Sequence, residues 1–170
     1  MASSGFVVLD ASAFYAGTAF LAAGSGYNKG NFVTTSSIVE EVGHIKKSHA
    51  ALDVLLDSGN LAIIDPDEAS TSTIVAAAKK TGDYARLSRA DLSVLALALQ
   101  MRATLVSDDY AAANVAAALQ INVEMSSGKG IRERRKYMTY CSACGRAFSP
   151  DEKECPLCGN ALKRKYKKVG

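Results

Sequence analysis

The stretch F-V-V-L-D at residues 6–10 decides the fold, because four apolar residues run directly into a carboxylate. A short, uninterrupted apolar run is typical of a strand buried on both faces, as in a parallel sheet. Asp10 would then lie at the carboxyl end of that strand, where open parallel sheets form their ligand crevice.

Further strands and helices are expected to alternate after this stretch. We expect a helix capped by Ser12 and running to about Leu21, then a loop over 24–30. Ser88, with Asp91 three positions later, marks another helix start. The remaining predictions are helices from Ser36 or Ser37, over 50–56, 68–80, 88–101 and 111–119, and strands over 61–64, 104–106 and 121–123. This alternation predicts an α/β fold with a doubly wound parallel sheet.

The net charge of +3 conceals two parts of opposite sign. Residues 1–125 hold 8 Lys and Arg against 13 Asp and Glu, whereas residues 126–170 hold 12 against 4. An acidic body with a basic end indicates a polyanionic partner bound mainly by that end. No apolar run approaches the ~18 residues of a membrane span, and residues 1–14 lack a basic signal region, so we expect a cytoplasmic protein.

All four cysteines of the chain lie in the basic part, with the spacing C-x2-C-x10-C-x2-C. Paired cysteines at this spacing are typical of one closed, tetrahedral Zn²⁺ site, and disulfides are rare in a reducing compartment. We therefore expect a small zinc ribbon that needs its metal to fold. The predicted ligands are Cys141, Cys144, Cys155 and Cys158.

The expected domains are 1–125 for the α/β body, 126–136 for a basic linker, 137–163 for the ribbon, and 164–170 for a basic, frayed tail. Tyr137, Tyr140 and Tyr166 are interleaved with basic residues, a composition that suits phosphates and unpaired bases. A solvated, solubilising tail is the alternative. The basic set comprises Lys129, Arg132, Arg134, Arg135, Lys136, Arg146, Lys163, Arg164, Lys165, Lys167 and Lys168.

Several carboxylates are expected at one end of the sheet. Asp10 and the pair Asp108-Asp109 follow strands, and Asp91 and Glu41 lie on helices near the same end. Such a cluster needs cations, and oxygen-only ligands suit Mg²⁺ or Mn²⁺. These ions support phosphodiester hydrolysis. The alternative is that these acids cap helices and interact with helix dipoles.

Four motifs resemble those of PIN-domain ribonucleases. They are V-L-D-A-S-A-F at 8–14, I-V-E-E-V at 38–42, T-G-D-Y-A-R-L-S-R-A-D-L at 81–92 and L-V-S-D-D-Y at 105–110. Joined to a C-terminal zinc ribbon, they are similar to the compact archaeal form of the Nob-type ribosome-biogenesis endonucleases. The order of the motifs, rather than any one of them, carries the resemblance.

The resemblance implies Asp10, Glu41, Asp91 and Asp109 as the ligands of the catalytic metal. Glu41 is preferred to Glu40, its neighbour about 100° around a helix, and Asp109 to Asp108. Ser107 occupies a position that is commonly Thr in the family, and it keeps the hydroxyl. Asp83 in T-G-D-Y could support the metal site or could be structural, and we favour the structural role. The number of metal ions, one or two, stays open.

The resemblance also implies an activity: endonucleolytic maturation of the 3′ end of small-subunit (16S) rRNA. The partners would be that rRNA, the precursor small ribosomal subunit and other assembly factors. Two alternatives are a toxin-like PIN ribonuclease acting on tRNA or mRNA, and a non-catalytic zinc-ribbon assembly factor.

Overall fold

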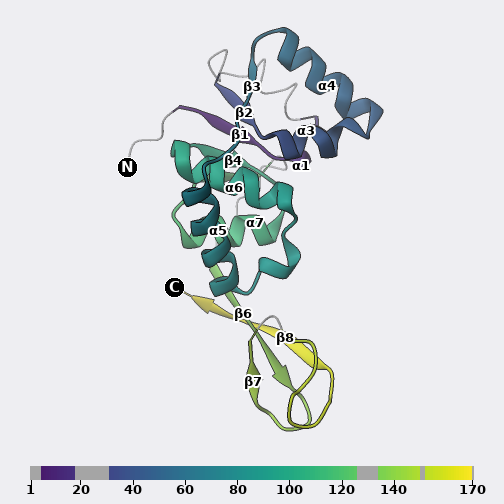
Figure 1. The fold of residues 1–170 in the computed structure, drawn as a ribbon, viewed down its shortest axis with the longest axis vertical. Coiled ribbons are helices and arrows are strands. Elements are labelled where there is room, and N and C mark those ends of the chain that lie inside the picture. Colours follow the sequence, from purple (N-terminus) through teal and green to yellow (C-terminus); the bar gives the residue numbers. More distant parts are fainter. Residues whose placement is uncertain (1–4, 18–30, 126–133, 150–151, 170) are drawn as a thin grey trace.

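The computed structural model describes residues 5–17, 31–125, 134–149 and 152–169. The first part is an α/β domain built on a parallel sheet of order β3-β2-β1-β4-β5. Its strands are β1 (Val7–Leu9), β2 (Phe32–Thr34), β3 (Leu61–Ile63), β4 (Thr104–Val106) and β5 (Val123–Glu124). The predicted doubly wound sheet is therefore confirmed, and Figure 1 shows the helices that cover it.

Two groups of helices pack against the sheet. One comprises α1 (Ala11–Tyr15), α3 (Ser36–Gly43) and α4 (Lys46–Asp57), which contact one another. The other comprises α5 (Glu68–Thr81), α6 (Arg89–Met101) and α7 (Tyr110–Ala118), and a 3-10 turn (Tyr84–Arg86) follows α5. The sheet grows from β1 toward β3 and then, after the crossover, from β4 toward β5. Because parallel crossovers are right-handed, this reversal sends the two groups to opposite faces.

The reversal also creates a topological switch point between β1 and β4. These strands are paired in parallel, with Val7 opposite Thr104 and Leu9 opposite Val106. Both strands are buried among apolar side chains, so their carboxyl ends lie side by side at one edge of the hydrophobic core. The Asp10 N–H donates to the Val106 carbonyl (3.1 Å), which continues the pairing to the first acidic residue.

Several local predictions need correction. Phe32–Thr34 was missed and forms β2, so the sheet has one more strand than expected. Asp10, not Ser12, caps α1, and the rest of the predicted helix beyond residue 17 lies outside the described residues, as do the loop 24–30 and residues 126–133 of the predicted linker 126–136. Residues 134–136 of that linker instead belong to a strand. The caps of α5 and α6 are confirmed: Gly82 ends α5 in the left-handed conformation, and Ser88 and Asp91 form a capping box.

Helix α7 owes its close packing to alanine. Its sequence is Y-A-A-A-N-V-A-A-A, and Ala111 to Ala116 are buried. Small side chains let the helix lie near the neighbours that it contacts, α5 and α6. None of the described helices is long and apolar enough to cross a membrane.

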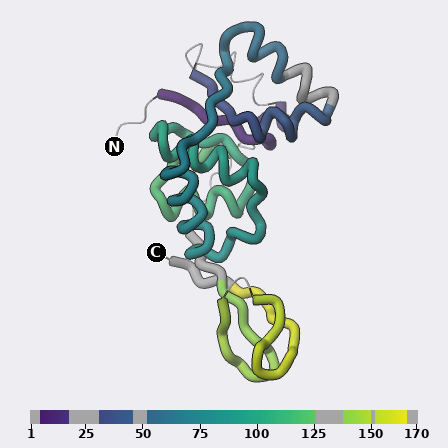
Figure 2. The backbone as a smooth tube through the Cα atoms, viewed as in Figure 1, coloured from purple at the N-terminus to yellow at the C-terminus, as the bar shows by residue number. Residues whose placement is uncertain are grey.

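The cysteine-containing part is a three-stranded antiparallel sheet of order β7-β6-β8. It consists of β6 (Arg134–Cys141), β7 (Ala147–Phe148) and β8 (Leu162–Val169). Pairing runs from Arg134 opposite Val169 to Cys141 opposite Leu162. The expectation of a frayed basic end is therefore wrong, because residues 162–169 form a paired strand. Figure 2 shows this sheet leaving the α/β domain as a separate lobe.

Candidate functional site

Asp10 is the central carboxylate of the candidate site, and only 3% of its surface is exposed. One carboxylate oxygen accepts from the Ala11 N–H (2.7 Å), and the other from Ser107 Oγ (2.6 Å) and Ser12 Oγ (3.1 Å). Burial raises the pKa of Asp10, as does the charge of Asp91, while the hydrogen bonds, that of Ser107 foremost, oppose the rise. Asp10 is thus a buried acid whose charge is only partly compensated by neutral donors.

Ser107 links Asp10 to Asp109 across the switch point. It follows β4, is fully buried, and its Oγ accepts from the Asp109 N–H (3.1 Å) while donating to Asp10. Asp109 in turn caps α7, with Oδ1 accepting from the Ala111 N–H (2.7 Å). Asp108 lies beside this link, since its N–H donates to Ser12 Oγ (3.0 Å). The hydroxyl of Ser107 therefore fixes the relative positions of two predicted ligands.

Asp91 approaches from the start of α6. Its Oδ2 accepts from the Ser88 N–H (2.7 Å), and its own N–H donates to Ser88 Oγ (3.1 Å). These bonds are those of a helix cap, so the capping alternative holds for this residue. Its charge nevertheless acts on Asp10, which places the two carboxylates in the same region.

Glu41 reaches the site through Tyr15, a residue that the sequence did not single out. Tyr15 Oη donates to Glu41 Oε1 (3.4 Å). Burial raises the pKa of Tyr15, and the charges of Glu41 and Asp10 raise it further. The charges of both acids therefore act on Tyr15, and its hydrogen bond is to Glu41. The choice of Glu41 over Glu40 as a ligand stays a prediction. A tyrosine five residues after an acid has no motif of its own, so only the fold reveals it.

A second contact holds the Glu41 and Asp91 helices together. Thr35 Oγ1, at the start of α3, lies 2.7 Å from Ser93 Oγ in the first turns of α6. Thr35 is buried and Ser93 is half-buried. The four acids are thus carried by elements that are joined directly to one another.

The four acids, Asp10, Glu41, Asp91 and Asp109, are called the acid site below. Among the residues that the structure describes, the only group of three or more Cys, His, Asp or Glu side chains close enough to share one ion is the cysteine group. The acids share one end of the sheet without meeting at a single point, and their role as metal ligands stays a prediction. Their all-oxygen donor set, with Asp10 buried, fits a hard divalent cation.

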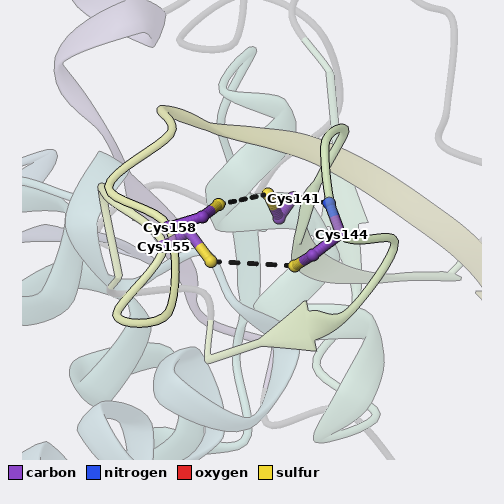
Figure 3. Close-up of side chains that lie close together, drawn as sticks. All are labelled: Cys141, Cys144, Cys155 and Cys158. Atoms are coloured by element: carbon purple, nitrogen blue, oxygen red, sulfur yellow. Dashed lines mark hydrogen bonds between the residues drawn. The ribbon is translucent and has the colours of Figure 1, made fainter.

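The four cysteines form a compact metal-ligand cluster (Figure 3). Cys141 Sγ lies 3.5 Å from Cys158 Sγ, Cys144 Sγ lies 3.8 Å from Cys155 Sγ, and all four atoms lie within 4.8 Å of one another. Four sulfurs bound to Zn²⁺ at ~2.3 Å would be roughly 3.8 Å apart in a tetrahedron. The Cys144 N–H donates to Cys141 Sγ (3.4 Å), and this bond is the main cause that lowers the pKa of Cys141 to about 6. The cluster therefore fits a tetrahedral metal ion.

Asp83 lies outside the acid site. It is completely buried and bonds to Asn114 of α7 and to Arg164 of β8. The preferred structural role is thus supported, although its partner in the ribbon could not be foreseen. Arg164 is correspondingly engaged with the α/β domain instead of belonging to a free basic surface.

Only some of the remaining basic side chains belong to the part of the chain that the structure describes. Lys163 and Lys165 are exposed on β8, and Lys165 Nζ lies 4.8 Å from the centre of the Tyr140 ring. Arg146 is exposed near the cysteines. Outside the described part are Lys129, Arg132 and the side chains of Arg134, Arg135, Lys136, Tyr137, Tyr166, Lys167 and Lys168.

Comparisons with known proteins agree with this architecture. Residues 7–101 match the family model described as the PIN domain of ribonuclease. The chain is 36% identical over 159 residues to Endoribonuclease Nob1 of Pyrococcus abyssi, covering 92% of this chain and 91% of the relative. It is 35% identical over 167 residues to Endoribonuclease Nob1 of Methanocaldococcus jannaschii, covering 95% and 78%.

Ribonuclease VapC1 of Thermoplasma acidophilum is also similar, at 35% identity over 140 residues, with 82% of this chain and 71% of the relative covered. The family model spans the strands and helices that carry Asp10, Glu41 and Asp91, and the Methanocaldococcus jannaschii relative, which covers 95% of this chain, extends across the cysteine cluster. The chain therefore belongs to the PIN-domain ribonuclease family and is a nuclease of this family.

Proposed function

We propose that this nuclease matures the 3′ end of small-subunit (16S) rRNA within the precursor small ribosomal subunit. The observation that carries the proposal is the hydrogen-bonded unit Asp10–Ser107–Asp109 at the sheet's switch point, in a chain that also carries a four-cysteine ribbon. Relatives named Endoribonuclease Nob1 in several archaea support the assignment. A cytoplasmic location and contacts with other assembly factors belong to the same proposal.

The catalytic ion in this proposal is Mg²⁺ or Mn²⁺, held by Asp10, Glu41, Asp91 and Asp109. Bound there, such an ion would acidify and orient a water and stabilise charge on phosphoryl oxygens. The chain contributes part of the ligand arrangement itself, since Ser107 links Asp10 to Asp109 and Tyr15 donates a hydrogen bond to Glu41. Hydrolysis by water predicts products with 5′-phosphate and 3′-hydroxyl ends. A 2′,3′-cyclic phosphate product would contradict this mechanism.

The ribbon's ion in this proposal is Zn²⁺, with a structural role. Four thiolates fill a tetrahedral site and leave no open position for a substrate. The ion would hold the ends of β6 and β8 together, where Cys141 pairs with Leu162.

The RNA-binding surface in this proposal includes Lys163, Lys165 and Tyr140. The lysines would bind phosphates and the tyrosine would stack on an unpaired base. If about six phosphates are neutralised in all, log K should fall with log salt at a slope near −4 for single-stranded RNA. An affinity that is insensitive to salt would contradict the model.

The alternatives have less support. A toxin-like ribonuclease resembles the VapC1 relative, but the Nob1-named relatives recur in several organisms and cover most of this chain. A non-catalytic assembly factor would not need Asp10 buried and linked to Asp109.

The deciding experiment uses a short RNA that spans the mature 3′ end of 16S rRNA and its trailer. The purified chain is incubated with Mn²⁺ or with EDTA, and Asp10→Asn is run beside the wild type. We expect one Mn²⁺-dependent cut at the mature end, absent in the variant. Equal cleavage of unrelated RNAs would favour the broad ribonuclease, and binding without any cut would favour the assembly factor or an enzyme that requires the assembled particle.

A further inference from the structure

Asp83 is a buried carboxylate whose cationic partner comes from the other lobe of the molecule. Its Oδ2 accepts from Asn114 Nδ2 (2.6 Å), and its Oδ1 accepts from Arg164 Nη2 (2.9 Å). The same Arg164 nitrogen donates to the Gly82 carbonyl (2.6 Å). Asp83 is 0% exposed and the Arg164 side chain 30%. The end of α5, the middle of α7 and strand β8 therefore meet at one carboxylate.

A buried charge is strongly destabilising unless it is paired. Asn114 supplies a neutral donor, whereas the positive charge comes from the ribbon. Strand β6, the partner of β8, also contacts α5 and α7, so the ion pair lies within a packed contact between the lobes. The nuclease domain thus carries a carboxylate whose charge is balanced by the docked ribbon.

Helix α7 connects this ion pair to the acid site. Asp109 caps the helix, and Asn114 lies five residues further on, a distance of about 7.5 Å along the axis. Asn114 is buried, as is most of α7. One short, packed helix therefore begins at the acid-site residue Asp109 and, through Asn114, contacts Asp83, which we call the ribbon's anchor because it binds Arg164.

The register of β8 fixes which face of the ribbon meets the nuclease domain. Successive side chains of a strand point to opposite faces, so Arg164 points one way and Lys163 and Lys165 the other. Arg164 reaches Asp83 and the Gly82 carbonyl, while Lys163 and Lys165 are exposed and Tyr140, opposite Lys163 in the ladder, has its ring centre 4.8 Å from Lys165 Nζ. We call Lys163, Lys165 and Tyr140 the lysine face.

We infer that Asp83 and Arg164 are positioning residues that hold the ribbon in one orientation on the nuclease domain. In that orientation the lysine face keeps a constant position relative to the acid site, and this determines which phosphodiester of a bound RNA reaches the acids. The inference rests on the proposed function for its RNA, but the orientation itself is independent of catalysis.

The test uses the full, zinc-loaded chain and three variants: Arg164→Met, the double variant Asp83→Asn with Arg164→Met, and Lys153→Met. The double variant removes both charges, so it stays informative if Asp83 left unpaired unfolds the domain. Lys153→Met is the matched control. Lys153 is an exposed ribbon lysine, and its carbonyl, which accepts from the Leu162 N–H, is unchanged by the substitution.

The first measurement is ¹⁵N relaxation without RNA, which gives a rotational correlation time for each lobe. We expect one common value in the wild type and in Lys153→Met, and a shorter value for the ribbon in the double variant. A ribbon that still tumbles with the nuclease domain when both charges are gone would overturn the inference. This measurement does not depend on activity, so it can fail or succeed whether or not the chain cuts rRNA.

The second measurement maps cut positions and separates kcat from KM. Small displacements of a reacting group can lower a rate on the order of 100-fold. In the double variant we therefore expect the rate of cleavage at the wild-type position to fall by roughly ten- to a hundredfold, with new cuts at neighbouring positions. KM should change less than kcat, because the lysine face is retained. A double variant that cuts at the wild-type position alone, at the wild-type rate, would also overturn the inference. A wild type that cuts neither the short RNA nor the precursor small subunit would instead refute the proposed function, and the relaxation measurement would still decide the inference.

Discussion

Ser107 is the residue on which the geometry of the acid site depends most directly. Its hydroxyl is fully buried, donates to Asp10 and accepts from the Asp109 N–H. Ser107, at the end of strand β4, therefore links Asp10 after strand β1 to Asp109 at the start of helix α7. Removing its Oγ atom should displace both acids.

Replacing Ser107 with alanine is expected to lower the free energy of unfolding by about 1–3 kcal/mol, because a buried carboxylate oxygen loses its shortest donor. Denaturation in urea measures the change. Ser107→Thr is the control, since it keeps the hydroxyl. Equal stability of the alanine variant and the wild type would show that Ser12 and water satisfy Asp10 without Ser107.

Asp10→Asn is expected to stabilise the metal-free protein. Burial and Asp91 raise the pKa of Asp10 above its ordinary 3.8, so the folded state disfavours the charged form. The resulting destabilisation is absent below the ordinary pKa and grows as the pH rises through the raised value. In EDTA, the Tm of Asp10→Asn should exceed that of the wild type at neutral pH, and the two should converge in acid. A lower Tm for the variant at neutral pH would contradict the expectation.

Single residues also show where reading the sequence fails. Asp83 and Arg164 are 81 positions apart, and each looks ordinary in its own segment: an acid after a helix and one basic residue among several. Their pairing depends on the docking of two lobes, which no local pattern encodes. Tyr15 is similar, since its role depends on α3 lying beside α1.

At the scale of elements, the end of α5 and the start of α6 are well predicted. Helix α5 ends at Gly82 in the left-handed conformation, and α6 begins with a reciprocal Ser88–Asp91 cap. Caps are predictable because they involve neighbours in sequence. Strand β2 is missed by the sequence analysis because only two apolar residues, Phe32 and Val33, precede the polar run T-T-S-S, and the strand gains its stability from pairing with β1 and β3.

Strand β8 was missed for another reason. Its sequence, L-K-R-K-Y-K-K-V, is so rich in charge that composition suggests a solvated tail. The strand exists because β6 offers it a full antiparallel ladder, in which the paired residues run from Cys141 with Leu162 to Arg134 with Val169 and are therefore far apart in the chain. Long-range pairing here overrides local composition.

The start of α5 allows a test at this scale. Asp67 accepts from the Ser70 N–H (2.6 Å), and this bond lowers the pKa of Asp67 below 3.8. A lowered pKa contributes stability that is present above 3.8 and is lost as the pH falls below it. Asp67→Ala should therefore lower Tm at neutral pH, with the difference shrinking in strong acid. The Tm of Asp67→Asn, which keeps the capping oxygen, should lie between those of the wild type and Asp67→Ala. A difference in Tm that does not change with pH would contradict the assignment.

Helix α7 should resist enlargement. Ala112 is 1% exposed, so Ala112→Leu would force neighbouring elements apart and cost about 1–3 kcal/mol of the free energy of unfolding. Ala118→Leu, at an exposed position of the same helix, is the matched control and should change stability little. Denaturation curves measure the free energy of unfolding of both variants. Equal decreases in the two variants would indicate an effect of helix propensity instead of packing.

At the scale of the whole molecule, the two lobes depend on different forces. The α/β lobe has a continuous apolar core, whereas in the ribbon the buried hydrophobic residues are chiefly Cys141 and Cys155 among the described positions. A lobe without a core of its own depends on its metal ion for stability. The two lobes should therefore unfold under different conditions.

Removal of the ribbon's metal is expected to unfold that lobe alone. After treatment with a strong chelator, the amide protons of β6 and β8 should exchange rapidly, while those of β1 and β4 stay protected. Metal analysis should give one equivalent of zinc per chain before treatment and none after it. Loss of protection in both lobes together would show instead that the nuclease domain requires the docked ribbon.

The alanines of α7 also affect how this enzyme can be mapped. Six of the nine residues of this helix are already alanine, including buried ones that keep it close to its neighbours. An alanine scan would be silent over most of the segment between Asp109 and the ribbon's anchor, and would record it as unimportant. Scanning with a larger side chain, or with glycine to loosen the helix, is the mutagenesis that would reveal its contribution.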